Sequence, residues 1–206
     1  MSKTGITVTG EGRVSQKPDI LLAKLGAEVT ASSVESALER CSAHMSEMIK
    51  VLHAGSVPGS DTTTAGASVR NAYSEGKARG WVANQSLSVR FRDLAQAGEL
   101  VTRVLSAGGN AARLHHLGFD VDDPTEAQHE ARRLAFADAQ TKAELYAQLA
   151  SRQLGAVNRV LETGSPGGGA VMRTMSAGRA GSAPAMPVES GSLDITVTVE
   201  INWDLI

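Results

Sequence analysis

An alanine at every fourth position between residues 127 and 147 is the feature that most restricts the fold of this chain. The segment opens with the run DPTE, which favours a helix start through side-chain capping, a preset proline angle and the helix dipole. Small side chains in one row let a neighbouring backbone approach closely. We therefore predict a long helix, ending near Leu154, whose alanine row faces a sheet or another helix. The row comprises Ala127, Ala131, Ala135, Ala139, Ala143 and Ala147.

Two shorter segments, 32–55 and 93–109, have the apolar spacing of three and four that is typical of helices. The first predicts an apolar stripe of Val34, Leu38, Cys41, Met45, Ile49 and Leu52, and the second a stripe of Leu94, Ala97, Val101, Val104 and Leu105. Cys41 lies in the middle of its stripe, so we expect a buried thiol without a redox role.

Alternating or β-branched runs predict strands between and around these helices. They cover residues 6–16, 19–31, 62–74, 80–92, 112–123, 156–163 and 193–205. Strands grouped in hairpins, with helices between them, predict an α+β fold in which helices pack on one face of a mostly antiparallel sheet. The order strand, strand, helix occurs twice, which makes it a candidate internal repeat.

The composition excludes several classes of function. The chain has 206 residues, a net charge of −2 and 3% aromatic residues, which is not the basic, aromatic surface that nucleic acids require. One cysteine cannot form an intrachain disulfide or a cysteine-built metal site. The sequence contains no run of 18 apolar residues, so no transmembrane segment is predicted.

No motif in the sequence assembles an active site. The run GEG at residues 10–12 lacks the third glycine and the following helix of a dinucleotide loop, and we interpret it as a bend or bulge in a strand. His115 and His116 adjoin in a strand and should point to opposite faces, so they should not chelate one metal. No serine stands in a nucleophile elbow. We expect no enzyme, and no catalytic, cofactor-binding or metal-binding residues.

The sequence as a whole resembles the SIMPL-domain family, which includes bacterial periplasmic immunogenic proteins and oxidative-stress defence proteins. The resemblance starts at ITVTGEGRVSQKPD, a strand with a V-x-G-x-G pattern followed by a Pro-Asp strand. It continues in GWVANQSLSVRFRDL, with Trp81 at the aromatic position, and in EARRLAFADAQTKAELYAQ. It ends in MPVESGSLDITVTVEINWDL, where Ser190 and Gly191 replace the usual Pro-Gly.

The resemblance implies a mixed α+β domain that self-assembles into rings, without an established active site and with a loose association with stress tolerance. Most bacterial members are exported. The sequence begins without a leader, so as written we expect a soluble cytoplasmic protein, or a periplasmic one if a leader precedes it.

A segment rich in Gly, Pro and Met, residues 164–187, interrupts the expected single domain of residues 1–206 before its last strand. Ordering so many glycines is entropically costly, and a neighbouring subunit could offset that cost by burying methionines and pairing arginines. The candidate oligomer contacts are Met172, Arg173, Met175, Arg179 and Met186. A surface loop without this role is the other interpretation.

Two functions follow from these observations. The first is a non-enzymatic protein that assembles with itself into a ring-like homo-oligomer, with a role in stress protection. The alternative is a monomeric or dimeric adaptor that binds a peptide or protein on a sheet edge or on the long helix. Neither requires a cofactor.

Deleting the segment tests its role in assembly. A variant that joins Thr163 to Val188 through a short Gly-Ser turn should fold and elute at a smaller size than the parent chain, because the contacts between subunits are lost. Elution at the size of the parent would show that residues 164–187 do not hold an assembly together.

Overall fold

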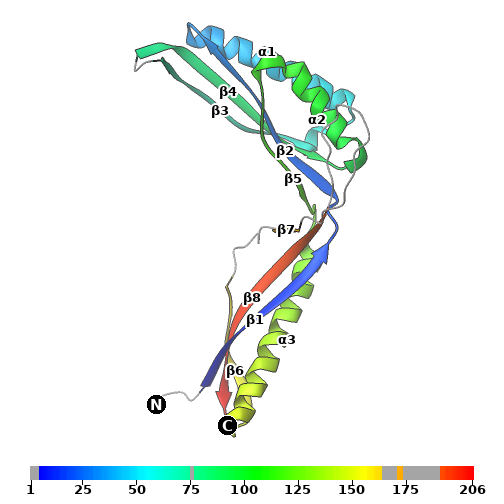
Figure 1. Cartoon of the computed structure of the whole chain (residues 1–206), viewed down its shortest axis with the longest axis vertical. Helices are drawn as coiled ribbons and strands as arrows, with labels where there is room; N and C mark the ends of the chain where they lie inside the picture. The colour runs from blue at the N-terminus through cyan, green and yellow to red at the C-terminus, as the bar shows by residue number, and fades with distance from the viewer. Residues whose placement is uncertain (1–4, 75–76, 164–170, 174–190) are drawn as a thin grey trace. The chain divides into compact units, whose positions relative to one another are not determined.

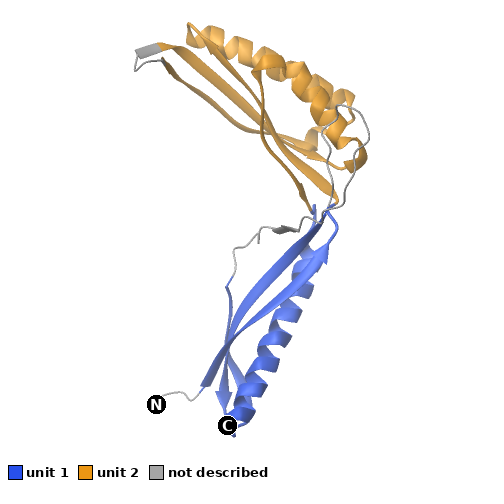
Figure 2. Cartoon of the chain, in the orientation of Figure 1, with its two compact units in different colours: residues 1–18, 121–177, 191–206 blue, residues 19–120, 178–190 orange. Residues whose placement is uncertain are grey.

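The computed structural model describes residues 5–74, 77–163, 171–173 and 191–206. Contacts group the chain into two compact units (Figure 2). Unit 1 comprises residues 1–18, 121–177 and 191–206, and unit 2 comprises residues 19–120 and 178–190. The description of residues 1–206 as a single domain stays a prediction.

Unit 2 contains one antiparallel sheet in the order β3-β4-β2-β5. Its elements are β2 (Ile20–Ala31), α1 (Val34–Ala54), the 3-10 turn η1 (Gly59–Asp61), β3 (Thr62–Ser74), β4 (Lys77–Phe91), α2 (Leu94–Gly108), the 3-10 turn η2 (Gly109–Ala111) and β5 (Ala112–Asp120). Chain order and strand order together define a β-α-β-β-α-β arrangement, the split βαβ topology. Both α1 and α2 lie on the same face of this sheet (Figure 1).

The strand, strand, helix order occurs along the chain as expected, but strands pair in another grouping. The first strand, β1 (Gly5–Gln16), pairs with the last strand, β8 (Ser192–Leu205), over its whole length. Within unit 2 the two similar halves are therefore β2-α1-β3 and β4-α2-β5.

The core of unit 2 confirms the expected burial of Cys41. Its side chain is fully buried, its thiol donates to the Ala27 carbonyl over 3.2 Å, and burial raises the pKa of the thiol. The first two residues of the predicted stripe on α1 were wrong, because Val34 and Leu38 are more than a third exposed. Ala37 and Met48 are buried instead.

Unit 1 contains a smaller antiparallel sheet in the order β1-β8-β6, on which one long helix packs. Besides β1 and β8 it comprises α3 (Thr125–Leu149), β6 (Leu154–Glu162) and the short β7 (Val171–Arg173), which pairs with the start of β8. The α+β class is thus confirmed, with the strands divided between two sheets. The helix ends five residues before the predicted Leu154, since Ser151 adopts a left-handed backbone angle of 54°.

The alanine row of α3 faces the sheet, as predicted. All six alanines are buried, and the middle four, Ala131 to Ala143, pack with Val197, Val199, Ile201 and Trp203 of β8. The glycines of β1 allow this contact: a Cβ on Gly10 would lie 2.1 Å from the Ala135 carbonyl oxygen, and one on Gly12 would lie 2.0 Å from that of Ala131. The interpretation of GEG as a bulge was wrong, because the β1–β8 register runs through it without a shift.

Enlarging a side chain of this row should destabilise the protein. Ala139→Leu inserts three carbons where the helix contacts β1, and overpacking of this kind costs about 1–3 kcal/mol. Ala137→Leu makes the same change on the exposed side of the same helix and should alter the free energy of unfolding by less than about 0.5 kcal/mol. Urea unfolding measures both. Equal stability of the two variants would contradict close packing at Ala139.

Candidate functional site

The described residues contain no group of three or more His, Cys, Asp or Glu that could hold a metal ion. The expectation that His115 and His116 of β5 point to opposite faces of the sheet was wrong. The β2–β5 register shifts between Lys24 and Leu25, opposite His115, and both imidazoles then lie over glycines of one sheet face. The His115 ring approaches Gly26 of β2, and the His116 ring approaches Gly118 of β5. Gly118 lies opposite Leu22, which is four residues, or about 13 Å, from Gly26 along β2. The two rings are therefore too far apart to chelate one metal.

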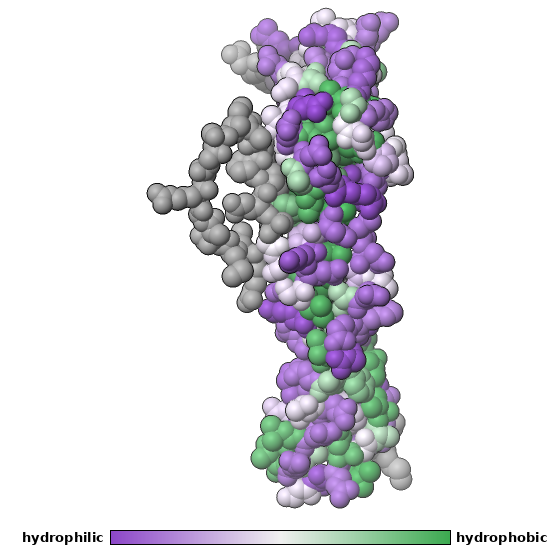
Figure 3. Space-filling view, turned by 90° about the vertical axis from the view of Figure 1, so that its right-hand side faces the viewer, coloured by the Kyte–Doolittle hydropathy of each residue, from purple (hydrophilic) through white to green (hydrophobic). Residues whose placement is uncertain are grey.

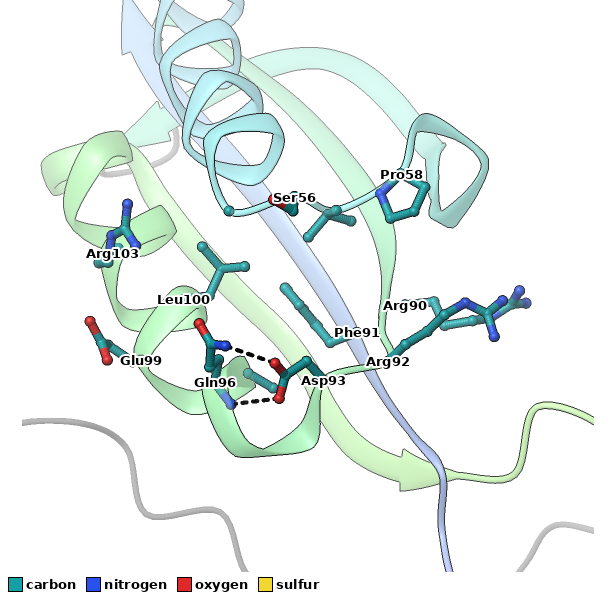
Figure 4. A pocket seen from close by; sticks show the side chains of 13 residues that line it. Ser56, Pro58, Arg90, Phe91, Arg92, Asp93, Gln96, Glu99, Leu100 and Arg103 are labelled. Atoms are coloured by element: carbon teal, nitrogen blue, oxygen red, sulfur yellow. Dashed lines mark hydrogen bonds between the residues drawn. The ribbon is translucent and has the colours of Figure 1, made fainter.

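A pocket of about 330 Å³ lies in unit 2, where α1 ends, β4 ends and α2 begins (Figure 4). Phe91 and Leu100 point into it and form an apolar floor, while Gln96, Glu99 and Arg103 of α2 stand at its rim. Its size is at the lower end of the range for small-molecule sites.

Local sequence positions the walls of this pocket. Asp93 caps α2: one carboxylate oxygen accepts from the amides of Ala95 and Gln96, and the other accepts from the Gln96 side chain over 2.8 Å. Gly55 ends α1 beside Leu100, whose methyl groups would lie 2.6 Å from an added Cβ. The Asp93 carboxylate is thus occupied as a cap.

A buried carboxylate lies beside the pocket and fixes two arginines. The Asp61 side chain is 4% exposed and accepts from Nε of Arg92 over 2.8 Å and from its Nη2 over 3.2 Å. Arg90 contributes a longer contact of 3.5 Å. The hydrogen bonds from Arg92 hold the pKa of Asp61 below its ordinary value, and burial opposes them. An ion-paired carboxylate of this kind is a poor general base.

Unit 1 presents a different feature, a partly uncovered apolar strip along β6. In the β6–β8 ladder Val157 pairs with Trp203 and Val160 with Ile201, which places both valines on the face where α3 packs. The helix lies over β1 and β8, however, and Val157 and Val160 remain 43% and 53% exposed. Phe136 of α3 stacks edge-on against Trp203 and is 37% exposed. We call Phe136, Val157 and Val160 the β6 strip.

The opposite edge of this sheet is protected by α3. Asp138 accepts a hydrogen bond from the Glu11 amide over 2.9 Å, and Lys142 donates to the Thr9 carbonyl over 3.1 Å. These two side chains also pair with each other, and they occupy backbone groups of β1 that a further strand would use. On the β6 side the contact is between side chains: Arg132 of α3 donates to Glu162 at the end of the strand.

Further apolar surface lies near the end of α3. Leu145, Tyr146 and Leu149 are each more than half exposed in the last turns of the helix. Figure 3 shows hydrophobic surface at this end of unit 1. Contiguous exposed apolar surface in a water-facing protein is typical of an interaction site.

The predicted oligomer contacts fall almost entirely outside the described residues. Met175, Arg179 and Met186 lie outside them, and for Met172 and Arg173 only the backbone of β7 is described. The sequence analysis missed the β6 strip, because valines in a strand are read as core. Only the position of α3 over β1 and β8 shows that they are not covered.

The geometry therefore defines an α+β protein with exposed apolar side chains on β6 and α3 and without a recognisable catalytic constellation among its described residues. Residues 6–203 match the SIMPL family, which is described as a protein of unknown function (DUF541). This match spans nearly the whole sequence, and the chain belongs to the SIMPL family.

Two curated relatives are similar to the chain. The 26 kDa periplasmic immunogenic proteins of Brucella melitensis biotype 1 and of Brucella abortus strain S19 are each 27% identical to it over 170 residues. Each alignment covers 78% of this chain and 67% of the relative. Both relatives are named as periplasmic proteins, so they do not support the expectation that this chain is cytoplasmic. No helix among the described residues is long and apolar enough to cross a membrane.

Removing the charge of Asp61 should destabilise unit 2 in a pH-dependent way. Asp61→Asn should cost about 1.5–3 kcal/mol at pH 7, because hydrogen bonds to a charged partner are lost in a buried setting. Since the folded pKa lies below the ordinary 3.8, the wild-type advantage should be fully present above that value and vanish as the pH falls through the folded pKa. Urea unfolding at neutral and acid pH measures this.

The matched control is Glu39→Gln on the exposed side of α1, which should change stability by less than about 0.5 kcal/mol at either pH. A penalty for Asp61→Asn that stays constant down to the lowest pH would contradict a role for the carboxylate charge.

Proposed function

We propose that this chain is a non-enzymatic protein of the bacterial periplasm that assembles with itself, and that a second copy covers the β6 strip. The observation that carries the proposal is the incomplete covering of β6: its valines lie on the core side of the sheet but are about half exposed. The periplasmic names of both relatives support the location.

The physical argument starts from the apolar area that β6 leaves in water. Burying apolar surface stabilises by about 25 cal/mol per Å², and a partner that covers both valines and Phe136 would recover this free energy. As an edge strand, β6 can also offer backbone groups along its outer side to a further strand. Its counterpart β1 is protected by Asp138 and Lys142, so association is favoured on one edge of the sheet.

Assembly is preferred over the adaptor function because apolar surface recurs at the end of α3. Leu145 and Leu149 could complete an interface between copies without any other protein. The adaptor alternative uses the same strip to bind a foreign strand or helix. A protective role under stress is an implication of the family resemblance, and no group of described residues supports it.

A charge in the β6 strip should prevent association. Light scattering at several concentrations should give the parent chain a mass above the 21.4 kDa of one copy, and Val160→Lys should reduce it to that of the monomer. The reason is that a buried lysine without a partner is costly at an interface. Thr141→Lys, on the exposed outer side of α3, adds the same charge and should leave the mass unchanged.

A parent chain that is monomeric at every concentration would overturn assembly and favour the adaptor function. An assembly that persists in Val160→Lys would show that the copies meet elsewhere.

A further inference from the structure

The face of the unit 2 sheet opposite α1 and α2 holds a cavity of about 300 Å³. On β2 and β4 the side chains alternate: Ala23, Leu25, Leu87 and Val89 belong to the helix-covered core. Leu22, Lys24, Ser88 and Arg90 therefore point the other way, and all four line the cavity. We call this side the uncovered face, with respect to the described elements of unit 2.

Strand register brings polar groups into one row across the cavity. His116 of β5 pairs with Lys24 of β2, Lys24 pairs with Ser88 of β4, and Ser88 pairs with Thr63 of β3. Side chains directly opposite each other in an antiparallel sheet have Cβ atoms about 4.5–5.5 Å apart. One imidazole, one ammonium group and two hydroxyls thus lie side by side, and each can donate a hydrogen bond.

The next row supplies an apolar floor and room for the histidine. Leu22 is half-buried there, opposite Arg90 of β4 and Gly118 of β5. An added Cβ at Gly118 would lie 2.9 Å from Nε2 of His116, so the glycine leaves space for the ring. The cavity therefore combines hydrogen-bond donors on one side with an aliphatic surface on the other.

The charges of the lining leave one cation without a carboxylate partner. Asp61 forms part of the wall, and its charge is matched by Arg92 and Arg90. Lys24 makes no ion pair within the described part of the chain. Because the two arginines already match Asp61, Lys24 adds a further positive charge to the lining.

We propose that this cavity binds a small organic carboxylate, with the carboxylate on Lys24 and the row of hydroxyls and its aliphatic stem on Leu22. The one ammonium group of Lys24 matches a single carboxylate, and the half-buried Leu22 suits an aliphatic stem, which inorganic phosphate lacks. Ammonium and hydroxyl donors form strong, charge-assisted hydrogen bonds to a carboxylate. The site is separate from the β6 strip and does not depend on the proposed assembly.

A carboxylate of this kind can belong to a free small acid or to the C-terminus of a peptide. Two probes distinguish these sources: butyrate, and N-acetyl-alanyl-leucine with a free C-terminus. Butyramide has the same stem without the charge, and inorganic phosphate tests the other anion. The methyl NMR signals of Leu22 in the full chain report binding of each probe at the cavity floor, and this measurement also suits large assemblies.

Butyrate or the peptide should shift the Leu22 methyl signals saturably at millimolar concentration, and butyramide should not. Tighter binding of the peptide would assign the site to a C-terminus, and tighter binding of butyrate to a free acid. Lys24→Gln should weaken binding about tenfold, since it removes a charge-assisted hydrogen bond. Lys50→Gln removes a charge from exposed α1 and should leave the affinity unchanged.

Three results would overturn the proposal: no saturable shift with either carboxylate, equal binding by butyramide, or tighter binding of phosphate than of both carboxylates. Unchanged affinity in Lys24→Gln would do the same. If Lys24→Gln fails to fold, Ser88→Ala provides the second test, because it removes a donor from the same row on an exposed position. An unchanged affinity in that variant would also overturn the proposal.

Discussion

The contact between the backbone of α3 and the backbone of β1 determines the architecture of unit 1. It requires a small residue on both sides, alanines on the helix and Gly10 and Gly12 on the strand. Because the helix packs so closely on β1 and β8, it covers little of β6. The same contact that packs one side of the sheet thus leaves the valines of the other strand exposed, and the surface available for association follows from the way the core is closed.

Unit 2 is organised by hydrophobic burial on one face and by electrostatic matching on the other. Its helices cover an apolar face that includes Cys41 and Met48. On the other face, ion pairs join the strands: Glu28 of β2 contacts Arg113 of the neighbouring β5 and, across β4, Arg70 of β3. Exposed pairs of this kind contribute little stability each, but they decide which cations remain free to bind another molecule. Lys24 differs from the arginines on this face because it makes no ion pair within the described residues.

Local patterns in the sequence were sufficient for the helices, the longer strands and the α+β class, because hydrophobic period depends only on near neighbours. The short β7 lies in the Gly-rich segment, where no strand was predicted. The alanine row even predicted which side of α3 is buried. Strand pairing could not be obtained in this way, since nothing local states that β1 meets β8 rather than β2. For the same reason the role of Gly10 and Gly12 was misread, and the exposed valines of β6 and the row containing Lys24 could not be predicted. Each depends on which strands become neighbours.

The pairing of β1 with β8 also has a consequence for how the chain reaches its native state. Gly5 lies opposite Asp204, so the two strands come from segments far apart in the sequence. The described strands and helices of unit 2 lie in one continuous stretch, residues 20–120, and can fold as soon as that stretch is available. Unit 1 must wait until β8 has been synthesised, and such distant contacts form slowly. Until then, α3 has its alanine row in water and half of its sheet missing, which makes this unit the part that a protease or a chaperone would meet in an unfinished chain.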